Sequence, residues 1–92
     1  MTKIKPIHPG KHLNEFLEDF EITPYRLAKD IGVPTTRIDQ ITKCKRSISA
    51  DTAARLGKYF GTTAQFWLNL QTNYELECLD PHLTDDISTV AA

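Results

Sequence analysis

Gly32 and Pro34 constrain the fold of this chain more than any other pair of residues. Upstream, Thr23 followed by Pro24 is typical of a helix N-terminus, because threonine caps the first turn and proline fits its first position. Gly32 suits the left-handed conformation in which many helices end, and Pro34 can begin a helix but cannot continue one. The sequence therefore predicts two short helices, over about residues 23–31 and 34–42, joined by a glycine turn.

Two helices joined in this way form the helix-turn-helix unit, whose spacing can be tested against the apolar residues. If Ala28 is the small residue at the closest approach of the two helices, the glycine belongs four residues later, at Gly32. The buried positions are then expected to be Leu27, Ile31, Val33, Ile38 and Ile41, which are all apolar. A plain helical bundle with a glycine at one helix end is the alternative, but it does not require seven positions to match one template.

Polar side chains cover the outer face of the second helix of this unit, and a basic loop follows it. The helix supplies Thr35, Thr36, Arg37, Asp39 and Gln40, and the loop supplies Lys43, Lys45 and Arg46. Such a second helix reaches base edges in the major groove, while neighbouring Lys and Arg hold phosphates. We therefore expect these eight residues to bind DNA, with Gln40 suited to adenine and Arg37 to guanine or phosphate.

Three more helices are expected around this unit. The first spans about residues 10–20, the fourth is capped by Ser49 and stops at Gly61, and the fifth spans about residues 63–79. Their inward positions are expected to be Leu13, Phe16, Leu17 and Phe20 in the first helix and Ala53, Leu56, Tyr59 and Phe60 in the fourth. At 92 residues, with no linker or strand pattern, the chain is expected to be an all-α protein with one domain over residues 1–80 and a flexible acidic tail over residues 81–92.

The net charge of -1 hides an asymmetry along the chain. All 11 Lys and Arg residues lie before residue 59, and residues 1–61 carry a formal charge of +4. Residues 62–92 contain five carboxylates and no Lys or Arg, which gives -5. The first two thirds can therefore bind a polyanion locally although the whole chain is slightly acidic.

Other chemistries have little support in the sequence. His8 and His12 are four residues apart, but Pro9 and Gly10 intervene and no third metal ligand is near. Cys44 and Cys78 belong to no CxxC pair and are expected to be reduced. We expect no catalytic residue, metal or cofactor, and no membrane span or signal peptide, which indicates a cytoplasmic protein.

Several segments together resemble a known family. These are Ile7-His8-Pro9-Gly10, the helix-turn-helix, Lys45-Arg46-Ser47-Ile48-Ser49, Ala53-Ala54-Arg55-Leu56, Phe60-Gly61-Thr62 and Phe66-Trp67-Leu68-Asn69-Leu70-Gln71. In this order, over roughly residues 6–78, they look like the HigA antitoxins of the lambda-repressor-like (Xre) group. The resemblance implies a five-helix repressor-like fold, usually dimeric, that neutralises a HigB-type messenger-RNA-cleaving toxin and represses its own operon.

Two positions depart from the family pattern. The loop usually has Asn-Gly before the basic pair, whereas this chain has Lys43-Cys44, so Cys44 is expected either in a strained left-handed conformation or in a different turn. Many repressors place Gln at the start of the second helix to hold a phosphate, and here that position is Pro24. The backbone amides of Thr23 and Tyr25 are the alternative phosphate ligands.

The fifth helix carries two apolar stripes, one through Phe66, Leu70, Tyr74 and Cys78 and the other through Leu68, Leu76 and Leu79. Two stripes need two partners, the domain body and a second copy of the chain, so we expect a homodimer with Leu68, Leu76 and Leu79 in its interface. Trp67 is expected in the core, with a binding hot spot as the alternative. A dimer implies an operator with an inverted repeat.

Contact with the toxin is expected on acidic residues. A ribonuclease must offer cations to phosphate, and Glu15, Glu18 and Asp19 form an acidic face on the first helix, with the acidic tail as the other candidate. A stand-alone phage-type regulator and a helical adaptor without DNA binding are the competing functions.

Overall fold

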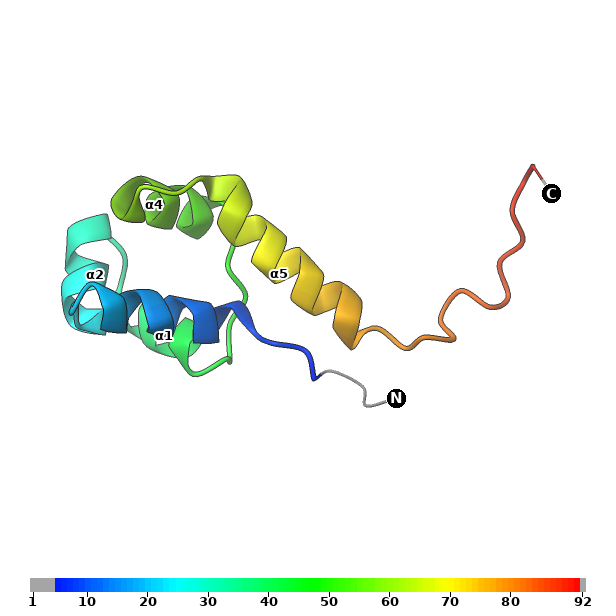
Figure 1. The fold of residues 1–92 in the computed structure, drawn as a ribbon, viewed down its shortest axis with the longest axis horizontal. Coiled ribbons are helices and arrows are strands. Elements are labelled where there is room, and N and C mark those ends of the chain that lie inside the picture. Colours follow the sequence, from blue (N-terminus) through cyan, green and yellow to red (C-terminus); the bar gives the residue numbers. More distant parts are fainter. Residues whose placement is uncertain (1–4, 92) are drawn as a thin grey trace.

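The computed structural model describes residues 5–91 and contains five α-helices in that range (Figure 1). They are α1 (Pro9–Asp19), α2 (Pro24–Ile31), α3 (Thr35–Thr42), α4 (Ala50–Phe60) and α5 (Ala64–Cys78). The predicted all-α class and five-helix order are confirmed, and the predicted bounds differ by only one or two residues. Residues 1–4 of the predicted domain and the last residue of the predicted tail lie outside the described residues.

Local capping explains most helix boundaries. The hydroxyl groups of Thr23, Ser49 and Thr63 accept backbone N–H groups of the first turns of α2, α4 and α5, at 3.1, 3.3 and 3.0 Å. Gly32 and Gly61 end α2 and α4 with φ of 74° and 73°. Only glycine adopts this left-handed region without a steric penalty, which is why these helices stop there.

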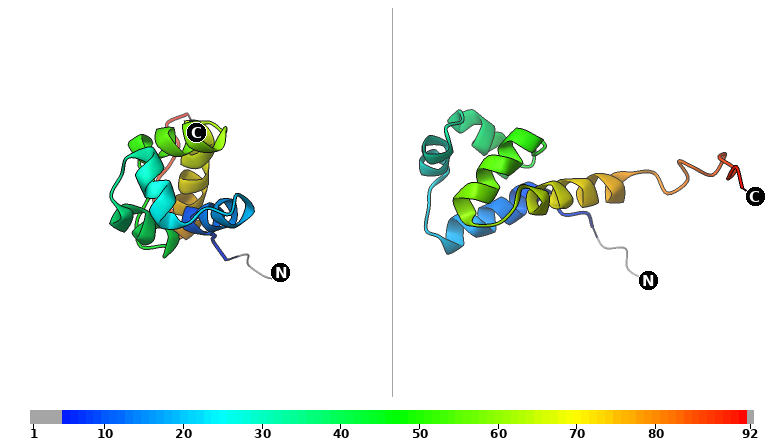
Figure 2. Two further views of the ribbon diagram at one scale, coloured as in Figure 1. Left: turned by 90° about the vertical axis from the view of Figure 1, so that its left-hand side faces the viewer. Right: turned by 90° about the horizontal axis from the view of Figure 1, so that it is seen from above.

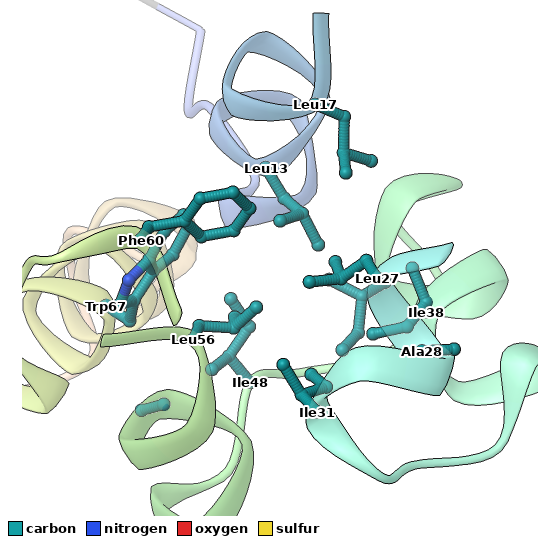
Figure 3. Packing of buried hydrophobic residues seen from close by; sticks show 12 residues of the cluster. Leu13, Leu17, Leu27, Ala28, Ile31, Ile38, Ile48, Leu56, Phe60 and Trp67 are labelled. Atoms are coloured by element: carbon teal, nitrogen blue, oxygen red, sulfur yellow. The ribbon is translucent and has the colours of Figure 1, made fainter. Parts of the chain in front are cut away.

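The core lies where all five helices meet (Figure 3). Leu13 of α1 lies between Phe60 of α4 and Leu27 of α2, and Leu17 of α1 lies on the far side of Leu13 from Phe60 (Figure 3). Trp67 of α5 is fully buried and donates its indole N–H to the Thr62 hydroxyl at 2.9 Å. The expectation that Trp67 is a core residue is confirmed.

Four positions predicted to face the core are less buried than expected. One of them, Phe16, is half-buried, with its ring against Phe60 and Trp67. Phe20 is 54% exposed, because α1 ends at Asp19 and the chain then turns through Glu21 at φ 54°. Its ring lies against Phe16 and Phe60 at the rim of the core. Val33 and Tyr59 are half-buried at the edges of the turn and of α4. The predicted burial was therefore wrong for Phe20 and too deep for Phe16, Val33 and Tyr59.

The fifth helix packs on the body through its first half. Trp67 and Gln71 are its buried residues, with Leu68 and Leu70 half-buried beside them. Leu76 and Leu79 are exposed at its far end. Beyond it, residues 80–91 run away from the helical body (Figures 1 and 2), every one of them exposed. In the described part of the chain, no helix is both long and apolar enough to cross a membrane.

Candidate nucleic-acid interface

The turn between α2 and α3 has the predicted geometry. The backbone N–H groups of Gly32 and Val33 both bond to the Ala28 carbonyl, the second at 3.0 Å. Ala28 is buried between the helices, with 1% of its surface exposed. The small residue and the glycine four positions later therefore set how α3 leaves α2, and the expected helix-turn-helix spacing is confirmed.

The first helix supports the C-terminal end of α3 from behind. A Cβ atom on Gly10 would lie 1.8 Å from the Ile41 carbonyl oxygen, so no other residue fits there without moving backbone. One turn later, the Asn14 side chain donates to the Thr42 carbonyl at 3.1 Å. These contacts fix the distance between α1 and α3 through main-chain atoms of α3.

A buried histidine begins α1 beside this contact. The His8 Nδ1 atom accepts the Gly10 backbone N–H at 2.9 Å and so caps the helix. Burial lowers the pKa of His8 from its usual 6.5, because the charged imidazolium loses hydration there. The His8 ring also meets the edge of the Tyr74 ring, at 4.9 Å between centroids. Among residues 5–91, no three His, Cys, Asp or Glu side chains form a group that could hold a metal ion.

Arg55 of α4 holds the C-terminal end of α2, at the turn of the helix-turn-helix. Its guanidinium donates to the Ile31 carbonyl at 2.7 Å, at the C-terminus of α2, and its Nε bonds to Asp51 at 2.8 Å. Asp51 also lies 3.8 Å from the guanidinium of Arg37 on α3. A chain of charged groups therefore connects α2, α4 and α3. The sequence reasoning missed both Arg55 and Asp51, although Arg55 stands in one of the segments that carry the family resemblance.

Gln71 of α5 fixes the loop between α3 and α4. Its side-chain oxygen accepts the Ile48 backbone N–H at 2.8 Å, and its amide donates to Glu75 at 3.0 Å. Gln71 is 5% exposed, and Ile48 is 2% exposed. Gln71 also had no individual predicted role. Its place in the Trp-Leu-Asn-Leu-Gln run, one of the segments that carry the family resemblance, was the sequence signal for it.

Fewer residues of α3 point fully outward than predicted. Thr36 and Gln40 are exposed, and Lys43 continues their line at the helix end. Thr35, Arg37 and Asp39 are half-buried along the sides of the helix. All five predicted residues reach the surface, but the stripe that faces outward most fully is Thr36, Gln40 and Lys43, at the i, i+4 and i+7 spacing of one helical face.

Arg37 is turned toward α4 rather than outward. Its guanidinium faces Asp51, and its Nε atom is buried without a hydrogen-bond partner among the residues that the structure describes. In this arrangement, the carboxylate of Asp51 holds the positive charge of Arg37 at the edge of the reading face.

The basic loop after α3 has the strained conformation that the sequence suggested. Cys44 has φ 62°, so the left-handed alternative for this residue is confirmed. Its N–H bonds to the Ile41 carbonyl at 3.0 Å, and the next N–H, of Lys45, bonds to the Gln40 carbonyl at 2.8 Å. Arg46 donates to the Gln40 side-chain oxygen at 3.3 Å. The loop thus folds back on α3 and gathers three exposed cations, Lys43, Lys45 and Arg46, around Gln40.

The acidic residues predicted to meet the toxin lie on the outside of α1. Glu15, Glu18 and Asp19 are all exposed. None of them forms an ion pair within residues 5–91, so their charges are available to a partner.

These features define an all-α helix-turn-helix protein of the DNA-binding class. Residues 12–65 match the model of the Cro/C1-type HTH DNA-binding domain family. The fold matches PA4674 of Pseudomonas aeruginosa, solved in complex with its 18-base-pair operator DNA, with a TM-score of 0.87 and 41% identity over 96% of this chain and 100% of that one.

Two further comparisons narrow the assignment. The Pseudomonas aeruginosa antitoxin HigA, solved with the higBA promoter, matches with a TM-score of 0.76 and 43% identity over 85% of this chain and 99% of that one. Virulence-associated protein I of Dichelobacter nodosus is 47% identical over 83% of this chain and 71% of its own length. The chain belongs to the HigA antitoxins of the Cro/C1-type helix-turn-helix family.

Proposed function

We propose that this chain is the antitoxin of a type II toxin-antitoxin module, which neutralises a HigB-like messenger-RNA-cleaving toxin and represses its own operon. The observation that carries the proposal is the reading face of α3: Thr36 and Gln40 point outward beside the exposed cations of the loop, on helices held by bonds to main-chain atoms. Both its DNA and the toxin's messenger RNA place its action in the cytoplasm. It acts by binding and needs no catalytic residue or cofactor.

Base recognition is assigned to the outward face of α3, along which Thr36 and Gln40 are exposed. Thr36 and Gln40 would contact base edges, flanked by Thr35 and Asp39, and Arg37 would reach guanine or phosphate by leaving Asp51. The Gln40 oxygen has two lone pairs, so the bond from Arg46 orients its amide and leaves capacity for adenine. Lys43, Lys45 and Arg46 would hold the phosphates on either side.

A homodimer would place two such faces on one operator. The exposed Leu76 and Leu79 at the end of α5 are the apolar surface proposed for self-association, with the half-buried Leu68 at the base of the same helix. Two-fold repressors read half-sites about 34 Å apart. The proposed operator is therefore an inverted repeat with half-site centres roughly 10 base pairs apart, or a multiple of that spacing.

The exposed acidic face of α1, Glu15, Glu18 and Asp19, is proposed to meet the cationic surface of the toxin. Opposed charges raise the association rate and the specificity of such an encounter. This face lies on α1, whereas the base-reading residues lie on α3, so operator and toxin can be bound together.

Two measurements with the purified chain and the toxin encoded beside its gene test the proposal. The chain should shift the DNA upstream of its own gene and should block messenger-RNA cleavage by the toxin. Reversing charge at Glu15 and Glu18 should slow toxin association, most strongly at low salt, and leave operator binding unchanged. DNA binding without any effect on a neighbouring toxin would instead identify a stand-alone regulator.

A further inference from the structure

The segment after α5 carries an unpartnered apolar stripe. Leu83, Ile87 and Val90 are 59%, 72% and 106% exposed. They stand at the i, i+4 and i+7 spacing that places side chains on one face of a helix. The positions opposite this face, such as Asp85, Ser88 and Thr89, are polar. A sequence with this pattern can bury a continuous apolar face only if it becomes helical.

The same segment already has the beginning of a helix. The Asp80 side chain accepts the His82 backbone N–H at 2.9 Å, which is an N-cap bond, and Pro81 occupies the first helical position. The N–H groups of Leu83 and Ile87 bond to carbonyls three residues earlier, at 3.0 Å each. His82 and Asp85 pair at 2.8 Å. The backbone from Asp80 to Ile87 is thus a series of turns that follows a correctly formed helix start.

The segment is too short and too rich in residues of low helix propensity to form a stable helix without a partner. A helix of about ten residues is marginal in water, and Thr, Ile and Val have low helix propensity. No other element of the part of the chain that the structure describes packs on this stripe, since every residue from 80 to 91 is exposed. An apolar groove on a partner would supply the missing burial, as in other complexes in which an amphipathic helix folds on binding.

Charge identifies the kind of partner. The segment carries three carboxylates, Asp80, Asp85 and Asp86, and the last Lys or Arg of the chain is Lys58. A groove with a basic rim complements them. A second copy of this chain is a poor partner for the segment. Its exposed cations, Lys43, Lys45 and Arg46, form the surface proposed to bind DNA and would not be free for the aspartates. A nuclease that binds the phosphates of messenger RNA has cationic surface by necessity.

We infer that residues 80–90 fold into an amphipathic helix on the toxin, with Leu83, Ile87 and Val90 in an apolar groove and the three aspartates against its basic rim. This inference rests on the proposed function. The toxin would then meet two surfaces of this chain, the acidic face of α1 and the helix of residues 80–90, and the two would have different roles. The α1 carboxylates speed the encounter, and the apolar stripe slows dissociation.

Variants of the full chain test this contact. Leu83→Ser with Ile87→Ser removes the stripe, and Ser88→Pro prevents the helix while keeping every apolar and acidic side chain. Ser88→Ala is the matched control, since it keeps the helix and lies off the stripe. Affinity for the purified toxin, measured by calorimetry, should fall about tenfold or more in the first two variants and change little in the control. Operator binding should be equal in all four proteins, because the segment is not part of the core.

A second readout concerns the conformation of the segment. Backbone NMR shifts of residues 81–90 should become helical when unlabelled toxin is added to the labelled full chain, and should not do so in Ser88→Pro. If the wild-type chain fails to bind the toxin, the proposed function itself is wrong. If the wild type binds and the stripe variants bind equally well, the inference is overturned while the antitoxin function stands. Loss of self-association with unchanged toxin affinity would place the segment on a second copy and also overturn it.

Discussion

The side chain of Gln71 accepts the backbone N–H of Ile48 at 2.8 Å, in a site where both residues are almost fully buried. This bond ties α5 to the loop that follows the reading helix. Among the side-chain hydrogen bonds of residues 5–91, it is the only one that joins α5 to this loop.

Replacing Gln71 with methionine keeps the volume but leaves the Ile48 N–H buried and unsatisfied. Such a group costs about 1–3 kcal/mol, so the free energy of unfolding should fall by that amount in urea denaturation. Gln65→Met is the control, because Gln65 is exposed and bonds only to Asn69 within the described chain. Equal stability of the two variants would contradict the role given to Gln71.

Gln40 and Lys45 should affect DNA binding differently. Gln40→Ala should relax base preference, since a good base contact contributes about 1–3 kcal/mol of discrimination. Lys45→Ala should weaken operator and scrambled DNA alike and reduce the salt dependence by about one counterion. Fluorescence anisotropy across a salt series measures both effects. If Gln40→Ala leaves the operator preference unchanged, the reading face lies elsewhere.

Asp51→Asn should tighten DNA binding and make it less selective. The change releases Arg37 from the carboxylate 3.8 Å away and removes a negative charge beside the reading face. Because the Asp51 side chain is 61% exposed, stability should change by less than about 1 kcal/mol. Affinity for scrambled DNA should rise relative to Asp85→Asn, a control in the tail. Unaltered affinity would show that Arg37 reaches DNA without leaving Asp51, or does not reach it.

Leu76→Asp with Leu79→Asp should weaken both self-association and operator binding without unfolding α1 to α4. Both side chains are exposed in the single chain, so the loss would come from the interface between copies. Sedimentation equilibrium and a gel shift measure the two effects. A wild-type chain that stays monomeric at high micromolar concentration would disprove this interface.

Acidification should destabilise the fold through His8. Its pKa is lowered by burial, so below about pH 6.5 the unfolded chain takes up a proton that the folded chain does not. Stability contributed by neutral His8 is therefore present above that pH and is lost as the pH falls toward the folded-state pKa. His8→Asn keeps a capping acceptor without this titration. The stability difference between wild type and His8→Asn, measured by thermal unfolding from pH 7.5 to 5, should shift in favour of the variant as pH falls.

The helix boundaries and the turn were predictable because their causes are local. Thr23, Ser49 and Thr63 cap the residues three positions later, and Gly32 acts on Ala28 four positions earlier. The four-residue distance between small residue and glycine was therefore visible in one short stretch. The left-handed conformation of Cys44 was one of two alternatives, and it followed from the Asn-Gly that the family has at this place in the loop.

The bonds that position α3 were not predictable, because they connect distant parts of the chain. Arg55 reaches Ile31 across 24 positions, and Gln71 reaches Ile48 across 23. Their partners are backbone atoms, which have no signature in the sequence. The exposure of Phe20 likewise depends on where the chain turns after α1. The dimer, DNA and toxin contacts remain predictions, since they depend on surfaces of other molecules.

Four contacts that position the helix-turn-helix and the loop after it have one property in common: they meet main-chain atoms. Gly10 abuts the Ile41 carbonyl, Asn14 and Arg55 bond to the Thr42 and Ile31 carbonyls, and Gln71 bonds to the Ile48 amide. None of them depends on which side chains stand at positions 36 and 40. The fold can therefore accept new residues at those positions without repositioning the helix that displays them. After duplication of such a gene, a few substitutions on α3 could change the operator sequence that one copy recognises. Each copy in a genome with several would then regulate only its own operon.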